Sequence, residues 1–198
     1  MKKIFEKIKS LFLGRGDYGF LDEQSLPKVP FTEKFITGAL DQKFIVTSDH
    51  NDIAKNHCGA TAATNLGLLY LDKVDQSELF AAMYEKIGQG PVILIGKKIS
   101  DVFKTYGKSL CYYRTRNLEK ILAGLKDNSM AILLLASGIF AWHYVMALGY
   151  RIYEDGESYL IIQDGWHKNK FFYYKINQGS LLLAATIYKL EGRLKDDQ

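Results

Sequence analysis

The sequence has few cysteines and prolines, and it lacks a long apolar run. Two cysteines in 198 residues exclude a disulfide-rich secreted scaffold and favour a reducing compartment. Three prolines and a hydrophobic content of 47% exclude a long disordered linker and favour a single domain with a sizeable core. No segment approaches the roughly 20 apolar residues of a membrane-spanning helix. We therefore expect one globular domain in the cytoplasm.

The formal charge is only +4, and Lys and Arg are interleaved with Asp and Glu. Without a basic stripe or a nucleic-acid-binding motif, no nucleic-acid partner is expected. The glycine cluster at residues 88–91 is not followed by Lys-Ser/Thr as in a phosphate-binding loop. His50, His57 and His167 could join Cys58 as zinc ligands, but their spacing matches no usual zinc pattern. We therefore expect no metal and no cofactor.

The N-terminus begins with basic residues but does not continue as a signal peptide. Charged residues among the first nine positions interrupt the apolar run that such a peptide needs, and no cleavage site follows. The apolar residues of positions 4–12 recur at helical spacing and predict a short amphipathic helix. Two interpretations stay open: the helix packs on the domain, or it docks on a membrane surface or a partner protein. Residues 1–42 then form this helix and an irregular wrapping segment, and residues 43–198 form the main domain.

The periodicity of the main domain changes from helical to alternating along the chain. The pair Asp155-Gly156 between two alternating stretches predicts a β-hairpin. This order predicts an α+β fold, in which an N-terminal helical part packs on a C-terminal antiparallel sheet. The expected helices cover residues 56–71, 76–86, 99–106 and 117–125, and the expected strands cover residues 110–115, 130–136, 143–153, 158–164, 170–176 and 181–190.

Cys58 lies where a polar loop turns into an Ala-rich helix. Asn56 is a suitable N-cap, which would place Cys58 in the first helical turn. Free backbone N–H groups and the helix dipole favour a thiolate at this position. A nucleophilic sulfur also needs a base and a group that orients the base. Downstream, His143 opens one expected strand and Asp164 closes the next, whereas Cys111 lies inside a strand and is interpreted as structural.

The hairpin geometry restricts how His143 and Asp164 can meet. A two-residue turn at Asp155-Gly156 would place Ala147 opposite Asp164 and put Asp164 on the same face as His143. The two residues would still lie about four positions apart along the strands, which is roughly 13 Å. A hydrogen bond between them therefore requires a bulge or a longer turn.

Three short segments resemble the papain superfamily of cysteine peptidases, and above all the compact bacterial families related to bacteriocin-processing, double-glycine-leader peptidases. Residues 56–62, Asn-His-Cys-Gly-Ala-Thr-Ala, are similar to the Cys-Gly-Pro-Thr/Ala-Ala of these families. Residues 143–150 are similar to His-x-Val-x-x-x-Gly-Tyr, and residues 164–166, Asp-Gly-Trp, stand in the place of Asn/Asp-x-Trp. The likeness covers about residues 44–190. It implies a papain-like fold and hydrolysis of peptide bonds through an acyl-thioenzyme.

The resemblance also implies roles for individual residues. Cys58 would be the nucleophile, and His143 would be the base and later the acid. Asp164 would hold the tautomer of the imidazole, and Trp166 would shield the His–Asp pair from water. The substrate would be a peptide or a protein.

The oxyanion site departs from the family pattern. These enzymes commonly carry a Gln about six residues before the Cys, and this sequence has Asp52 there, which cannot donate when ionised. Asn51 is the nearest amide, so it is the candidate oxyanion donor beside the Cys58 N–H.

Two other functions stay open. The same three residues would support another acyl transfer, such as deamidation or transglutamination. Alternatively, the chain would be a non-catalytic papain-fold module whose cleft binds a peptide or a partner protein. Selective labelling of one thiol together with turnover favours the enzyme, and a groove without turnover favours the module.

Overall fold

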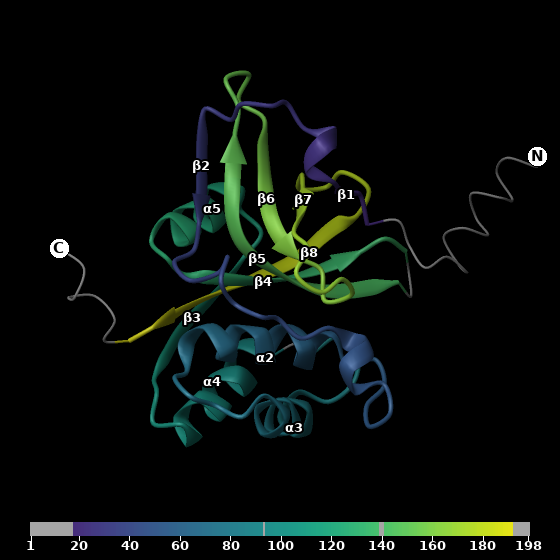
Figure 1. The fold of residues 1–198 in the computed structure, drawn as a ribbon, viewed down its shortest axis with the longest axis vertical. Helices are drawn as coiled ribbons and strands as arrows, with labels where there is room; N and C mark the ends of the chain where they lie inside the picture. Colours follow the sequence, from purple (N-terminus) through teal and green to yellow (C-terminus); the bar gives the residue numbers. More distant parts are fainter. Residues whose placement is uncertain (1–17, 93, 139–140, 192–198) are drawn as a thin grey trace, which may run out of the picture.

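The computed structural model describes residues 18–92, 94–138 and 141–191. Within them the chain forms an antiparallel sheet and a layer of helices beneath it (Figure 1). The expected amphipathic helix at the N-terminus lies outside the described residues. No described helix is long and apolar enough to cross a membrane. The helices are α2 (Cys58–Tyr70), α3 (Gln76–Ile87), α4 (Ile95–Thr105) and α5 (Leu118–Lys126), with the 3-10 turns η1 (Glu23–Ser25) and η2 (Thr47–His50). The strands are β1 (Phe20–Leu21), β2 (Thr32–Phe35), β3 (Leu110–Thr115), β4 (Met130–Ala136), β5 (Trp142–Ile152), β6 (Ser158–Gln163), β7 (Phe172–Tyr174) and β8 (Leu181–Leu190).

Seven of the eight described strands follow the order β1-β7-β6-β5-β4-β8-β3, and β2 pairs with β5 beside this path. All of these pairings are antiparallel, which confirms the expected α+β class with an antiparallel sheet. The central strands β4 and β5 are almost continuously apolar because helices cover both of their faces. Helix α2 packs below the sheet and α5 lies above it (Figure 1).

Helix α2 is enclosed between the sheet and α3, and its small residues allow the close fit. The side chains from Gly59 to Gly67 are all buried, so the helix has no polar face. A Cβ atom at Gly59 would lie 3.1 Å from the ring of Tyr144 on β5. A Cβ atom at Gly67 would lie 2.7 Å from Leu79 on α3. The two glycines therefore set how closely the helix approaches its neighbours.

The chain before residue 43 is more regular than expected. It supplies β1, which pairs with β7, and β2, which pairs with β5. A Cβ atom at Gly149 would lie 2.1 Å from the carbonyl oxygen of Lys34, so only glycine allows β2 to approach β5 this closely. These strands are short and pair with distant residues, so local patterns did not indicate them.

The boundaries of several other helices and strands can be compared with the expected ones. Strands β3, β4 and β8 span the expected residues, and Asn117 caps α5 by accepting from the Lys120 N–H at 3.1 Å. Helix α4 begins at Ile95, four residues before the expected start at residue 99, and includes Gly96. Gly96 packs there against the ring of Tyr112.

Candidate active site

Cys58 is the first residue of α2, but the expected N-cap was wrong by one residue. His57 holds the cap position and makes no side-chain capping bond. Asn56 has a φ of +47°, a left-handed conformation that Asn tolerates better than most residues. The loop is held by the Gly90 N–H, which donates to the Asn56 carbonyl at 3.1 Å, and by His57 Nε2, which lies 2.9 Å from the Thr47 carbonyl. Cys58 therefore keeps the helix-terminal position that the sequence indicated.

The half-buried Cys58 sulfur faces backbone donors. Burial raises the pKa of the Cys58 thiol, and the N–H groups of Tyr144, Gly59 and Cys58 itself oppose this shift by stabilising the thiolate. Two of these donors belong to the free N-terminus of α2, and the third belongs to β5. The sulfur thus lies at the junction of the helix layer and the sheet.

His143 lies at the same junction, directly before Tyr144 in β5. Its Nε2 lies 2.5 Å from the main-chain oxygen of Asp164. A carbonyl only accepts, so Nε2 carries the proton and Nδ1 keeps its lone pair. Burial lowers the pKa of His143 to about 4, although the Asp164 carbonyl and charge oppose this shift. The imidazole is therefore neutral at neutral pH, in the tautomer that leaves Nδ1 available as a base.

Two local irregularities bring Asp164 to His143, as the hairpin argument required. The turn has three residues, because the Tyr153 N–H donates to the Glu157 carbonyl at 2.9 Å across Glu154-Asp155-Gly156. A second shift lies between Ala147 and Gly149. As a result Ala147 pairs with Ile162 instead of Asp164, and Asp164 moves two positions closer to His143. The predicted shift of register is confirmed.

Asp164 contacts His143 through its main chain, whereas a side-chain contact was expected. Its carboxylate accepts from the backbone N–H groups of Trp166 at 2.9 Å and His167 at 3.0 Å. The same carboxylate lies 2.6 Å from Nδ1 of His167. Gly165 has a φ of +77°, which turns the chain so that the carboxylate faces its own loop. The carbonyl is thereby left to orient the imidazole.

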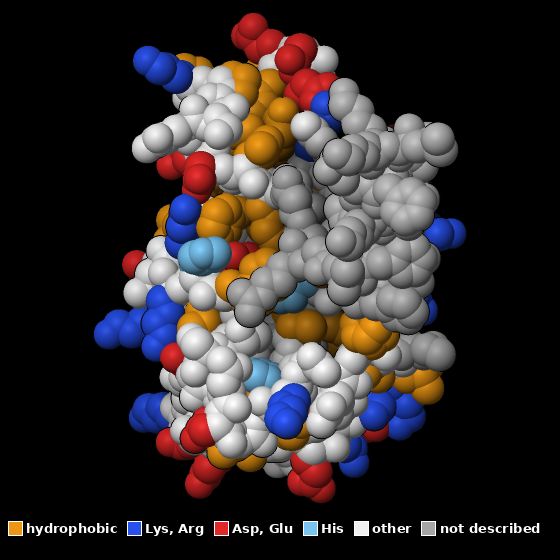
Figure 2. Space-filling model, turned by 90° about the vertical axis from the view of Figure 1, so that its right-hand side faces the viewer, with side chains coloured by type: hydrophobic (Ala, Val, Ile, Leu, Met, Phe, Trp, Pro, Cys, Tyr) orange, Lys and Arg blue, Asp and Glu red, His pale blue; other side chains and the backbone are white. Residues whose placement is uncertain are grey.

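Aromatic rings cover His143. Trp166 stacks on the imidazole with ring centroids 3.8 Å apart and planes inclined by 13°. Tyr18 approaches at 5.5 Å with its ring tilted by 52°. No sequence signal singled out Tyr18, because it lies 125 positions away from His143 in an apparently irregular segment. On this face of the molecule, histidine and hydrophobic side chains meet between the sheet and the helices (Figure 2).

Asn51 follows η2 with an exposed side chain, and Asp52 is exposed beside it. The described groups whose hydrogen bonds lower the pKa of Cys58 are backbone N–H groups, and the Asn51 amide is not among them. The geometry therefore offers the helix terminus, and not the Asn51 amide, as the source of oxyanion donors.

A buried amide pair connects the halves of the site. Asn65 of α2 accepts from the Ile45 N–H at 2.9 Å and donates to the Ile45 carbonyl at 3.0 Å. It also donates to Gln163 at 3.4 Å, and Gln163 accepts from the Gly165 N–H at 2.9 Å. The helix that carries Cys58 is thus tied to the loop that carries Asp164.

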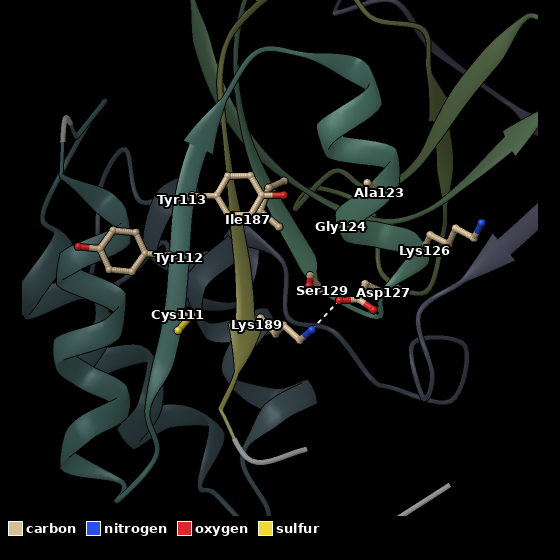
Figure 3. Close-up of a pocket in the computed structure, with 10 residues that line it drawn as sticks. All are labelled: Cys111, Tyr112, Tyr113, Ala123, Gly124, Lys126, Asp127, Ser129, Ile187 and Lys189. Carbon is tan, nitrogen blue, oxygen red and sulfur yellow. Dashed lines mark hydrogen bonds and ion pairs between the residues drawn. The ribbon is translucent and has the colours of Figure 1, made fainter. Parts of the chain in front are cut away.

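The remaining histidines and the second cysteine do not form a comparable site. His50 stacks on Phe80 at 3.8 Å, and the described residues contain no group of three or more His, Cys, Asp or Glu suited to a metal ion. Cys111 is exposed and lies 2.7 Å from a carboxylate oxygen of Glu191. Figure 3 shows it at the rim of a pocket that also holds the ion pair of Lys189 and Asp127. No histidine is among the described residues that line this pocket.

No known protein-family model matches the chain, and a search of curated proteins finds no significantly similar relative.

Proposed function

We propose that this protein is a papain-like cysteine peptidase that hydrolyses peptide bonds through an acyl-thioenzyme. The observation that carries the proposal is the junction of α2 and β5. There the helix-terminal Cys58 sulfur faces the backbone N–H of Tyr144, and the preceding residue of β5 is His143, whose Nε2–H is held by the Asp164 carbonyl. The helix layer packed on an antiparallel sheet, with the site at their junction, is compatible with a papain-like fold.

The reaction would begin with a neutral pair. The Cys58 sulfur attacks the substrate carbonyl carbon while its proton passes to Nδ1 of His143. The oxyanion that forms accepts hydrogen bonds from the N–H groups at the start of α2. The imidazolium then gives its proton to the leaving amine, and the C–N bond breaks. In the second half, water attacks the thioester, passes a proton to His143, and releases the acid and the Cys58 thiol.

Asp164 would be a positioning residue that acts through two different groups. Its carbonyl fixes the proton of His143 on Nε2, and its carboxylate holds the shape of the loop by accepting from the Trp166 and His167 N–H groups. Trp166, stacked on the imidazole, separates it from solvent.

The burial of Cys58 and His143 favours a second candidate function, a module that binds a peptide or a partner protein without cleaving it. Only 2% of the His143 surface is exposed, and burial raises the pKa of Cys58. A non-catalytic module that binds a peptide or partner protein would also tolerate such a neutral pair. The two free cysteines fit a reducing location, so we place either function in the cytoplasm.

A peptide-library screen read by mass spectrometry separates the candidates. The wild-type protein and the Cys111→Ser control should cleave the same peptides, and Cys58→Ser should cleave none. A parallel screen with an added primary amine would show acyl transfer as amide products in place of acids. Binding of peptides without cleavage by the wild-type protein would favour the module.

A further inference from the structure

Tyr18 is carried over the candidate site by a short, closely fitted segment. It precedes β1, which pairs with β7 through Phe20 and Tyr174. The hydroxyl of Ser180 donates to the Tyr18 carbonyl at 2.8 Å. Gly19 has a φ of +73°, and a Cβ atom there would lie 2.1 Å from the Gln178 carbonyl oxygen. These contacts fix where the Tyr18 side chain enters the site.

The Tyr18 ring is almost fully buried against His143 and Trp166. Only 6% of its surface is exposed, and its ring centroid lies 5.5 Å from that of His143 and 5.7 Å from that of Trp166. Trp166 stacks on the imidazole, so His143 contacts two aromatic rings. The surroundings of the candidate base are filled by side chains of this chain.

The same tyrosine also lies near the sulfur. Burial raises the pKa of the Tyr18 phenol, the Ser137 side chain opposes this, and the charge of a Cys58 thiolate raises the pKa further. Tyr18 is therefore near both members of the reacting pair. A substrate carbonyl must come within roughly 3–3.5 Å of the sulfur to react, which leaves little space for a buried phenol beside it.

We propose that Tyr18 is a removable cover over Cys58 and His143, and that substrate enters when this side chain leaves. This inference rests on the proposed function, because it concerns the regulation of the same site. The cover is removable because its support, β1, is a two-residue strand at the edge of the sheet. Short strands at the edge of a sheet are among the first parts of a fold to open.

Displacement of the Tyr18 side chain would change the charge states of Cys58 and His143. Burial now favours the neutral thiol and the neutral imidazole. When the cover leaves, the pKa of Cys58 falls and the pKa of His143 rises, and both changes favour a thiolate–imidazolium pair. The N–H groups that face the sulfur would then stabilise the thiolate with less opposition from burial.

The alkylation rate of Cys58 tests the cover without any substrate. Full-length wild-type, Tyr18→Ala and Tyr18→Phe proteins are treated with iodoacetamide near pH 7, and the labelled cysteines are quantified by mass spectrometry. Tyr18→Ala should speed labelling of Cys58 by about tenfold or more, since one pKa unit changes the thiolate fraction tenfold. Tyr18→Phe keeps the ring and should stay within about twofold of wild type. Cys111 is the internal reference, and Tyr159→Ala is the matched control away from the site.

An unchanged Cys58 rate in folded Tyr18→Ala protein would overturn the proposal, and so would a Tyr18→Phe rate as fast as that of Tyr18→Ala. Circular dichroism and an unchanged Cys111 rate establish that the fold is kept. If Tyr18→Ala does not fold, Tyr18→Leu replaces it with the same expectations. Peptide turnover is measured separately. If Tyr18→Ala speeds labelling of Cys58 but no peptide is cleaved, the cover is supported and the peptidase function is rejected. If peptides are cleaved but Tyr18→Ala leaves the labelling rate unchanged, the peptidase function is supported and the cover is rejected.

Discussion

Trp166 lies flat on the imidazole of His143, with ring centroids 3.8 Å apart and planes inclined by 13°. The indole is 43% exposed and the imidazole 2% exposed, so the tryptophan stands between the candidate base and water. An aromatic face also attracts a cation. The stack would therefore protect the neutral imidazole, and it would support the imidazolium that the proposed mechanism forms.

Removing this stack should change the titration of His143. Burial is the main cause of its low pKa, about 4, so Trp166→Ala should raise the pKa toward the ordinary value near 6.5. Trp166→Phe keeps an aromatic face and should raise it less. NMR titration of the His143 ring protons measures the shift, and an unchanged pKa in Trp166→Ala would show that burial by the indole is not its cause.

His143 should make the protein less stable in acid. Its pKa is lowered by folding, so the unfolded chain takes up a proton first, and stability falls as the pH drops from about 6.5 toward 4. The gap between these values corresponds to roughly 3 kcal/mol. Urea unfolding of wild type and His143→Gln at pH 7 and pH 4.5 measures the effect. The variant should show the smaller loss, and equal losses would assign the acid sensitivity to other groups.

Substitutions of His143 and Asp164 should lower turnover by different amounts. His143→Ala removes the base and should lower turnover by about 10²–10⁴. Asp164→Asn leaves the orienting carbonyl in place and keeps an oxygen that can accept from the Trp166 and His167 N–H groups, so turnover should fall by less than about tenfold. Steady-state kinetics on a peptide from the library screen compare them. An Asp164→Asn defect as large as that of His143→Ala would require the charge of the carboxylate in the mechanism.

Asn51 should be dispensable for the reaction. Loss of an oxyanion donor typically costs about 10²–10³ in rate, but the Asn51 side chain is exposed. Asn51→Ala should therefore keep turnover within about twofold of wild type. A loss of a hundredfold in folded protein would restore the amide to the oxyanion site.

The alkylation rate of Cys111 should depend on Glu191 and not on the residues of the candidate site. The hydrogen bond with Glu191 is the largest cause that raises the pKa of this thiol. Glu191→Gln should therefore speed alkylation of Cys111 severalfold near pH 7 and leave the Cys58 rate unchanged. A change at Cys58 instead would indicate that the two thiols are coupled.

Local features of the fold could be predicted from the sequence, and contacts between distant segments could not. The helix expected at residues 117–125 and the strand expected at residues 130–136 depend on neighbouring residues, and both are present. The need for a register shift followed from counting residues in the hairpin. Its place between Ala147 and Gly149 depends on how β5 bends between its partners, which no local pattern reveals.

In the candidate site, too, local features could be predicted and contacts between distant segments could not. The sequence indicated Cys58 at a helix start and His143 at a strand start, since both are local properties. It could not indicate which atom of Asp164 would meet the imidazole, because that depends on the turn at Gly165. Tyr18 reaches the site only through the pairing of β1 with β7, so its position was not predictable from its neighbours.

The distance between Cys58, the candidate nucleophile, and His143, the candidate base, depends on how closely the helix layer approaches the sheet. Cys58 belongs to the helices and His143 to the sheet, and Gly59 is the point where the helix rests on the Tyr144 ring. One methyl group there would lie 3.1 Å from the Tyr144 ring, so the ring, which follows His143 in β5, would have to move by a few tenths of an ångström. The alignment of the pair thus depends on a residue that has no chemistry of its own.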